Sequence, residues 1–253
     1  MLLHARILGE GTPLLILHGY FGMGDNWKSI GAKLSDRFQV HLIDQRNHGR
    51  SFHADDFDYE ILVEDLYAYI QYHQLEKVVI LGHSMGGKVA MLFAVTYPEM
   101  VSKLIVADIS PRFYSPHHQQ ILEALKTVDF TVQRSRKEVE DVLSESIEEA
   151  GVRQFLLKNV YWKEKGQLAY RFNLESLTVN SDEVGMALPS FTDYNGPTLF
   201  LKGEKSGYIS ASDTALIRAH FPKSEIKTVK NAGHWLHAEN PTAFYDYLSA
   251  FLY

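Results

Sequence analysis

Short runs of β-branched and aliphatic residues recur along the chain, and amphipathic segments separate them. Each run has the length of a buried strand rather than of a helix. We expect strands at 2–8, 14–17, 40–43, 78–81, 104–107, 197–201 and 225–229. Segments with apolar positions three or four residues apart predict helices at 25–38, 59–73, 88–97, 210–219 and 242–252. This alternation predicts an α/β domain with a mostly parallel sheet and helices on both of its faces.

The alternation stops between residues 112 and 190, where no strand pattern remains. Helices are expected there at 118–128, 135–150 and 152–159, with a looser one near 172–187. We interpret this stretch as a helical cap over the strand ends, and we assign 1–111 and 191–253 to the core and 112–190 to the cap. Some of its many aromatic residues should line a substrate pocket, and the others should form the cap's own core. From core and cap together, the expected substrate contacts are Phe21, His83, Phe113, Tyr161, Trp162 and Trp235.

The segment from Val78 to Ala90 carries the clearest chemical signal. An apolar run is followed at once by Gly-His-Ser-Met-Gly at 82–86 and then by a helix-forming segment. Strand, tight turn and helix form the context in which a G-x-S-x-G motif presents a nucleophilic serine. Glycine occupies the two flanking positions, where a side chain would collide with the strand or the helix. We therefore predict that Ser84 is a nucleophile.

A second glycine-containing loop, His-Gly-Tyr-Phe-Gly at 18–22, follows the strand at 14–17. In hydrolases with such a serine turn, this loop provides half of the oxyanion hole, whose backbone N–H groups face the developing negative charge. We expect the N–H groups of Tyr20 and Met85 to form the hole, with Phe21 as the alternative to Tyr20. Taken by itself, the His-Gly pair is more simply explained as an ordinary turn.

A nucleophilic serine needs a general base, and the chain has 12 histidines from which to choose it. His234 lies in a Gly-His loop after the last expected strand and before the final helix, which matches the chain order serine, acid, histidine of this class of enzyme. His237, three residues later, is the main rival, and packing beside the base is its simpler role. We predict that His234 is the base.

The acid that orients the base is expected in the loop after the strand at 197–201, commonly as G-x-x-D. Here the loop begins at Gly203, and Ser206 occupies the place of the aspartate. Asp108 ends the preceding strand of the sheet, on the same edge as the nucleophile, so its carboxylate could reach the far nitrogen of His234. We predict Asp108 as the acid, and Glu204 and Asp213 stay open as alternatives.

Composition narrows the range of functions. The chain has 31 acidic and 25 basic residues without long runs and a formal charge of −6, so it lacks the basic patch of a nucleic-acid-binding protein. It has no cysteine, which excludes disulfides, thiolate metal sites and a cysteine nucleophile. We see neither a secretory leader nor an apolar run long enough to span a membrane. We expect a cytoplasmic protein, a monomer or weak homodimer, that binds neither membrane nor nucleic acid.

The motifs taken together resemble the α/β-hydrolase superfamily, and within it the small YbfF-type bacterial esterases and their mitochondrial abhydrolase relatives. The matching segments are HGYFG at 18–22, DQRNHGRS at 44–51, GHSMGG at 82–87, VADISP at 106–111 and AGHWLHAENP at 232–241. The resemblance implies an α/β-hydrolase fold with a helical cap inserted after the sixth strand, and it places the acid on Asp108. It also implies hydrolysis of short- to medium-chain acyl esters, with acyl-CoA thioesters suspected, and no metal or organic cofactor.

Other functions are compatible with the same residues. The same serine, histidine and acid would serve a cofactor-free perhydrolase or a C–C bond hydrolase. From another class, the chain could be a small-molecule sensor built on a hydrolase fold, with cap movement as its signal. Four basic residues could meet the phosphates of CoA, although scattered bases are usually just solvated: Arg112, Lys158, Lys163 and Lys165.

Overall fold

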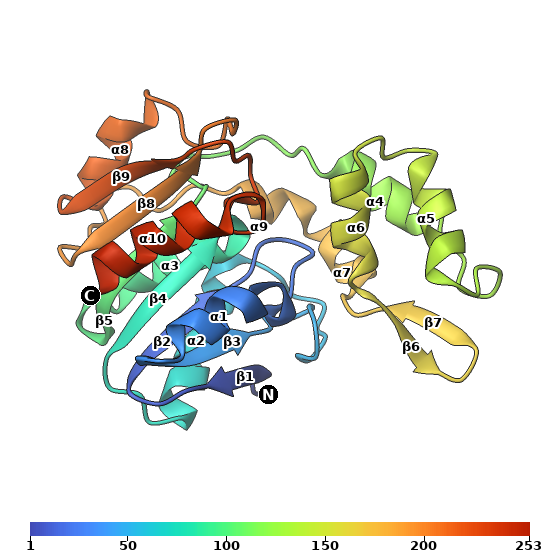
Figure 1. The fold of residues 1–253 in the computed structure, drawn as a ribbon, viewed down its shortest axis with the longest axis horizontal. Helices are drawn as coiled ribbons and strands as arrows, with labels where there is room; N and C mark the ends of the chain where they lie inside the picture. The colour runs from blue at the N-terminus through green and yellow to red at the C-terminus, as the bar shows by residue number, and fades with distance from the viewer.

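The structure, a computed structural model, describes residues 1–253 and contains a seven-stranded sheet in the order β1-β3-β2-β4-β5-β8-β9 (Figure 1). Only β1 runs antiparallel to its neighbour, and the other strands are parallel. The strands are β1 (Ala5–Leu8), β2 (Thr12–Leu17), β3 (Phe38–Ile43), β4 (Val78–His83), β5 (Val101–Ala107), β8 (Thr198–Gly203) and β9 (Ser224–Val229). The expected α/β architecture with a mostly parallel sheet is confirmed.

Helices cover both faces of the sheet because successive strand residues point to opposite sides. Leu14 and Ile16 of β2 pack with α1 and α10, whereas Leu15 and Leu17 belong to the core that α2, α3 and α8 complete. The helices of the core are η1 (Gly24–Trp27), α1 (Lys28–Leu34), α2 (Tyr59–Tyr72), α3 (Met85–Thr96), η2 (Pro98–Met100), α8 (Asp213–His220), α9 (Leu236–Glu239) and α10 (Pro241–Leu252). None of the helices of the protein is long and apolar enough to cross a membrane.

Residues between β5 and β8 form a separate lobe beyond the carboxyl ends of the strands (Figure 1). Its elements are α4 (Gln119–Lys126), α5 (Arg136–Ser144), α6 (Ala150–Leu157), β6 (Val160–Glu164), β7 (Gln167–Tyr170), α7 (Leu174–Val179) and η3 (Ser181–Gly185). We propose that this lobe is the cap, with the division at 112 and 190 drawn from the sequence.

Two details of the cap differ from expectation. It is not purely helical, because β6 and β7 pair as an antiparallel hairpin. The short alternating segments of this hairpin are joined by Glu164-Lys165-Gly166-Gln167, and Gly166 has φ 82°, a conformation that suits glycine in a tight turn. The cap also follows the fifth strand of the chain rather than the sixth, because a single antiparallel edge strand precedes β2.

Hydrogen bonds attach the cap to the core on two sides. Lys88 of α3 is buried, and its Nζ donates to the carbonyl oxygens of Pro111, Arg112 and Met186, at 3.2, 2.5 and 2.7 Å. It therefore binds both of the chain segments that connect the core with the cap. On the other side, the Tyr20 hydroxyl donates to the Leu177 carbonyl at 2.5 Å. The cap is therefore fixed above the strand ends rather than hanging from a linker.

Candidate active site

Ser84 stands at the sharp turn between β4 and α3. Its φ and ψ are 52° and −120°, a strained conformation for a residue with a side chain, and only 9% of its surface is exposed. A Cβ on Gly82 would overlap the carbonyl of Gly86, and one on Gly86 would overlap the carbonyl oxygens at the end of β2. Strand and helix therefore meet this closely only because both positions are glycine.

Asp108 and His234 are in direct contact across the strand ends. His234 Nδ1 lies 2.8 Å from Asp108 Oδ2, and the carboxylate is completely buried. The Gly203 N–H donates to Asp108 Oδ1 at 2.9 Å, and the Ser206 hydroxyl donates to Oδ2. Ser206, which occupies the usual place of the acid, thus binds the acid instead. Asp108 itself has φ 52°, a left-handed turn directly after β5.

The two alternative acids are engaged elsewhere. Glu204 forms an ion pair with Lys230 at 3.0 Å and accepts the Asn231 N–H at 2.8 Å. Asp213 forms an ion pair with Arg112 at 3.1 Å. Neither carboxylate contacts His234, which leaves Asp108 as the carboxylate in contact with that imidazole.

The loop that carries His234 is fixed from both sides. Glu239 accepts the N–H groups of Gly233 and Trp235, at 2.8 and 3.2 Å, so it holds both neighbours of the histidine. His83 donates its Nε2–H to the His234 carbonyl at 2.8 Å, which connects the serine turn to this loop. Sequence analysis did not single out Glu239, although a glutamate shortly after Gly-His and before Asn-Pro was visible. Ser84 and His234 line one cavity without a hydrogen bond between their side chains.

The loop at residues 19–22 presents a free backbone donor next to Ser84. Neither the Tyr20 N–H nor the Met85 N–H donates a hydrogen bond within the protein. The Phe21 N–H, by contrast, donates to His48 Nε2 at 3.2 Å, so the alternative for the oxyanion hole is already occupied. The Phe21 carbonyl accepts the Asn159 amide of the cap at 2.8 Å, which fixes the loop from above.

Buried histidines hold this loop in their uncharged form. Burial lowers the pKa of His18 to about 4 and that of His48 to about 3. His18 donates Nδ1–H to the Gly19 carbonyl at 2.8 Å and accepts the Gln45 N–H at Nε2 at 3.0 Å, so it uses one nitrogen as donor and the other as acceptor. These contacts assign a structural role to both histidines.

His237, the rival base, packs away from the acid. Its ring stacks on Trp27 with centroids 4.0 Å apart and an interplanar angle of 15°. Burial lowers its pKa to about 3, and it has no contact with Asp108. Its ring therefore serves as part of the cavity wall.

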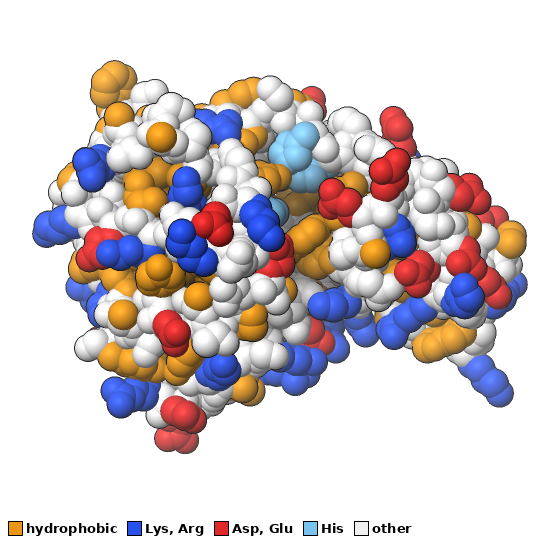
Figure 2. Space-filling view, turned by 45° about the horizontal axis from the view of Figure 1, so that its top comes forward, with side chains coloured by type: hydrophobic (Ala, Val, Ile, Leu, Met, Phe, Trp, Pro, Cys, Tyr) orange, Lys and Arg blue, Asp and Glu red, His pale blue; other side chains and the backbone are white.

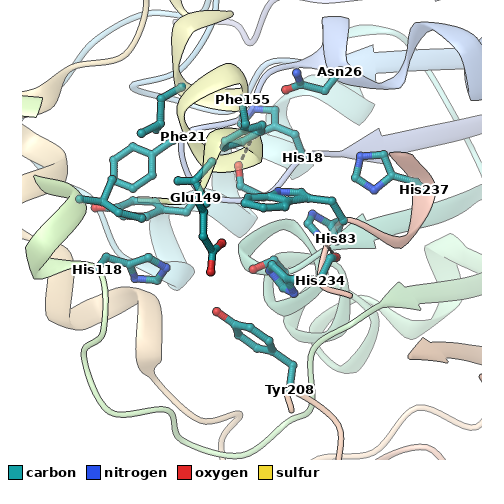
Figure 3. A pocket seen from close by; sticks show the side chains of 18 of the residues that line it. His18, Phe21, Asn26, His83, His118, Glu149, Phe155, Tyr208, His234 and His237 are labelled. Atoms are coloured by element: carbon teal, nitrogen blue, oxygen red, sulfur yellow. Dashed lines mark hydrogen bonds between the residues drawn. The ribbon is translucent and has the colours of Figure 1, made fainter. Parts of the chain in front are cut away.

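A cavity of about 460 Å³ opens above Ser84, and histidine side chains show at the hollow between core and cap (Figure 2). Of the expected substrate contacts, Phe21, His83 and Trp235 line this cavity, and Tyr20 does so as well. The lining residues that sequence analysis missed come mainly from two cap helices and one core loop, as Figure 3 shows for some of them: His117, His118, Ile121, Glu149, Val152, Phe155, Leu156 and Tyr208. No motif marks these positions, since any apolar helix face has the same pattern.

Three expected contacts are wrong. Phe113 precedes α4 and is 51% exposed, and it does not line the cavity. Trp162 is 57% exposed on β6, and Tyr161 beside it packs against the Arg171 guanidinium at 4.3 Å. Tyr161 and Trp162 lie on the β6–β7 hairpin, which the helical prediction overlooked, and neither lines the cavity above Ser84.

No group of three or more histidine, cysteine, aspartate or glutamate side chains is arranged to bind a metal ion. The polar groups at the cavity include Ser84, the His234–Asp108 pair and the free N–H groups of Tyr20 and Met85. Chemically, this arrangement could supply a nucleophile, a base with its acid, and donors for an oxyanion.

Comparisons with known proteins agree with this geometry. A family model described as alpha/beta hydrolase fold matches residues 12–143. The chain is 40% identical to a sn-1-specific diacylglycerol lipase of Danio rerio, over 96% of this chain and 79% of that protein. It is 29% identical to the esterase YbfF of Escherichia coli, over 92% of this chain and 90% of that protein. It is also similar to the solved structure of a marine microorganism esterase, at 47% identity with a TM-score of 0.95 and 99% of each chain covered.

Proposed function

The chain belongs to the α/β-hydrolase fold family and is a carboxylic ester hydrolase, and on this basis we propose that it works through a triad of Ser84, His234 and Asp108. The observation that carries the proposal is the 2.8 Å contact of His234 Nδ1 with a buried carboxylate, at the cavity that also contains Ser84. The pattern of acid, base and nucleophile supports acyl transfer through a covalent intermediate.

In the first half-reaction, Ser84 Oγ attacks the ester carbonyl and His234 Nε2 takes its proton. Asp108 holds Nδ1–H, so that Nε2 is the nitrogen free to accept. The contact between serine and base tightens when substrate is bound, as is common for such pairs. The N–H groups of Tyr20 and Met85 stabilise the tetrahedral oxyanion, and each such donor contributes about 10²- to 10³-fold to the rate of an acyl transfer.

Collapse of the tetrahedral intermediate breaks the bond between carbonyl carbon and alkoxy oxygen, and His234 returns the proton to the departing alcohol. Water then attacks the acyl-enzyme, again with His234 as base, and releases the acid and free Ser84. His234 takes up one proton and returns it in each half-reaction, and no cofactor is required.

For the substrate, we propose oxygen esters of short to medium acyl length. A cavity of about 460 Å³ with aromatic and aliphatic walls suits a small acyl group. The basic residues that could meet CoA phosphates do not line it, and Arg112 is engaged by Asp213. The Danio rerio relative is named for an acylglycerol, so a partial glyceride of this length is a natural first substrate to test.

Labelling with a fluorophosphonate, followed by peptide mapping, tests the proposal. We expect an adduct on Ser84 that His234→Ala abolishes. His53→Ala, a substitution of an exposed histidine outside the cavity, should label like the native protein. Absence of an adduct on folded protein would refute the triad and favour the hydrolase-fold sensor.

A further inference from the structure

The cavity at Ser84 has an unusual charge balance. Twenty residues line it, and none of them is lysine or arginine. Its single carboxylate besides the buried Asp108 behind His234 is Glu149 of the cap. An anionic group inside this cavity would contact no lysine or arginine side chain of the wall.

Four of the six histidines that line the cavity add no positive charge to this balance. Burial lowers the pKa of His18 to about 4 and the pKa values of His118 and His237 to about 3, and it holds the pKa of His83 well below its usual value. These four rings are uncharged at neutral pH. Glu149 is therefore the one carboxylate on a cavity wall that has no lysine or arginine.

Glu149 has no partner within the protein. It is the residue immediately before α6, where a side chain often accepts a backbone N–H, yet its carboxylate makes no capping hydrogen bond. It also forms no ion pair. Figure 3 shows the Glu149 carboxylate turned into the space between His118, His234 and Tyr208.

The alcohol half of the ester is the part that would enter this space. His234 has to reach the alkoxy oxygen in order to protonate it, so the alcohol half of the ester must extend past His234. The Tyr208 ring stacks on His234 with centroids 4.0 Å apart, and Phe155 packs on Trp235 at 5.3 Å. Aromatic rings beside a carboxylate form an environment that attracts an organic cation.

We propose that Glu149 is a specificity-determining residue that selects esters whose alcohol half is an organic cation and rejects those whose alcohol half is an anion. This inference rests on the serine esterase function proposed above. A positively charged ammonium group two or three bonds beyond the alkoxy oxygen would lie between the carboxylate and the aromatic rings. Because Glu149 is exposed, the attraction is partly screened by water and salt.

The test compares kcat/KM for three butyrate esters that differ only in the alcohol. The cationic ester is choline butyrate, and the neutral ester is its carbon isostere, in which a tert-butyl group replaces the trimethylammonium group. The anionic ester is butyryloxyacetate. The native protein should prefer the cation over the isostere by about three- to tenfold, in the range of an exposed charge pair plus a cation–π contact, and should cleave the anion more slowly than the isostere.

Glu149→Gln should bring the cation and its isostere to within about twofold of each other, as the charge attraction is removed. Glu145→Gln is the matched control, because Glu145 is an exposed cap acid that does not line the cavity, and it should keep the native preference. The preference of the native protein should also fall as salt is raised.

Equal rates for the cation and its isostere, or a preference that persists in Glu149→Gln, would overturn the inference while the esterase function stands. Loss of the preference in both glutamine variants would also overturn it, since the effect would then come from overall charge. Failure to cleave even the neutral ester, together with absence of Ser84 labelling, would instead overturn the proposed function and this inference with it.

Discussion

Replacing Asp108 by asparagine should remove most of the activity for a reason visible in the hydrogen bonds. The carboxylate accepts from three donors, namely Gly203 N–H, the Ser206 hydroxyl and His234 Nδ1–H. Asparagine has one acceptor oxygen, and its NH₂ group must face at least one of these donors. If NH₂ faces His234, the imidazole is held with Nδ1 as acceptor, and its proton moves to Nε2. That tautomer cannot take the proton of Ser84.

The magnitude follows from this tautomer. In triads of this kind, loss of the acid's charge lowers kcat by about 10³- to 10⁴-fold, which is about 4 to 5.5 kcal/mol of transition-state stabilisation. If the NH₂ group instead faces the Gly203 N–H, two donors meet at a position that is completely buried. This contact should lower the free energy of unfolding by about 1–3 kcal/mol. We therefore expect kcat for p-nitrophenyl butyrate to collapse, together with a modest fall in Tm.

A compensating pair of substitutions makes the test specific. The Ser206 hydroxyl already touches Asp108 Oδ2, so a carboxylate at 206 should reach nearly the same point beside His234. Asp108→Ser combined with Ser206→Asp should recover at least about tenfold in kcat over Asp108→Ser alone, as the orienting charge returns. If Asp108→Asn keeps more than about a tenth of the native kcat, far above the loss expected for a triad acid, the reasoning is refuted.

Three further expectations concern the pocket, the oxyanion loop and acid stability. Phe155→Ala should broaden the acyl- or alcohol-length profile whereas Trp162→Ala should not, and a change with Trp162→Ala alone would place the hairpin at the pocket after all. Asn159→Ala removes the buried donor to the Phe21 carbonyl, so kcat should fall with little change in KM. The lost hydrogen bond should also lower Tm by an amount that corresponds to about 1–2 kcal/mol. A rise in KM as large as the fall in kcat would contradict a role of this bond at the oxyanion hole. A histidine whose pKa in the folded protein is about 3 to 4 takes up a proton near pH 5 only when the chain unfolds. The free energy of unfolding is therefore highest above pH 6.5 and falls as pH drops below that value. At pH 5 each such histidine lowers it by up to about 2 kcal/mol. Urea titrations should therefore show a steep fall in stability between pH 7 and pH 5, and a flat profile would contradict the neutral states of His18, His48, His118 and His237.

Much of the core could be predicted because its elements have local signals. Residues 78–81 of β4 and 104–107 of β5 are continuous apolar runs, which is how a strand covered on both faces looks in sequence. The first helix was predicted too long, since α1 ends at Leu34 and β3 begins at Phe38. Between them, the apolar periodicity continues through a turn that the pattern cannot distinguish from helix.

The residues of the site also differ in how well the sequence predicts them. Ser84, His234 and Asp108 all follow strand ends of one sheet edge, so topology alone brings them together. The cap residues have no such constraint, because their positions depend on how α4, α6 and the hairpin pack on each other. Trp162 and Phe155 look alike in sequence, yet one is solvent-exposed and the other lines the cavity. Glu149 was invisible for the same reason, since one glutamate among 31 acids carries no signal of its own.

The bonds between cap and core also bear on how substrate reaches Ser84. A cap that swung open as a rigid body would break the contact of Tyr20 with Leu177 and that of Asn159 with Phe21. It would also pull Met186 from Lys88. At about 1 kcal/mol for each bond, or more where the donor is charged, such opening costs several kcal/mol and leaves the loop at residues 19–22 without its contacts to the cap.

A second cavity between α4 and α6 adjoins the first and shares four lining residues with it, His117, Ile121, Glu149 and Val152. A substrate that enters beside these residues breaks none of the bonds that hold the cap. Asn159→Ala measures one of those bonds directly, and a gain in kcat/KM for bulky esters in that variant would show that cap opening limits entry. Glu149 lines both cavities, so a substrate that enters through the second one passes this carboxylate before it reaches Ser84.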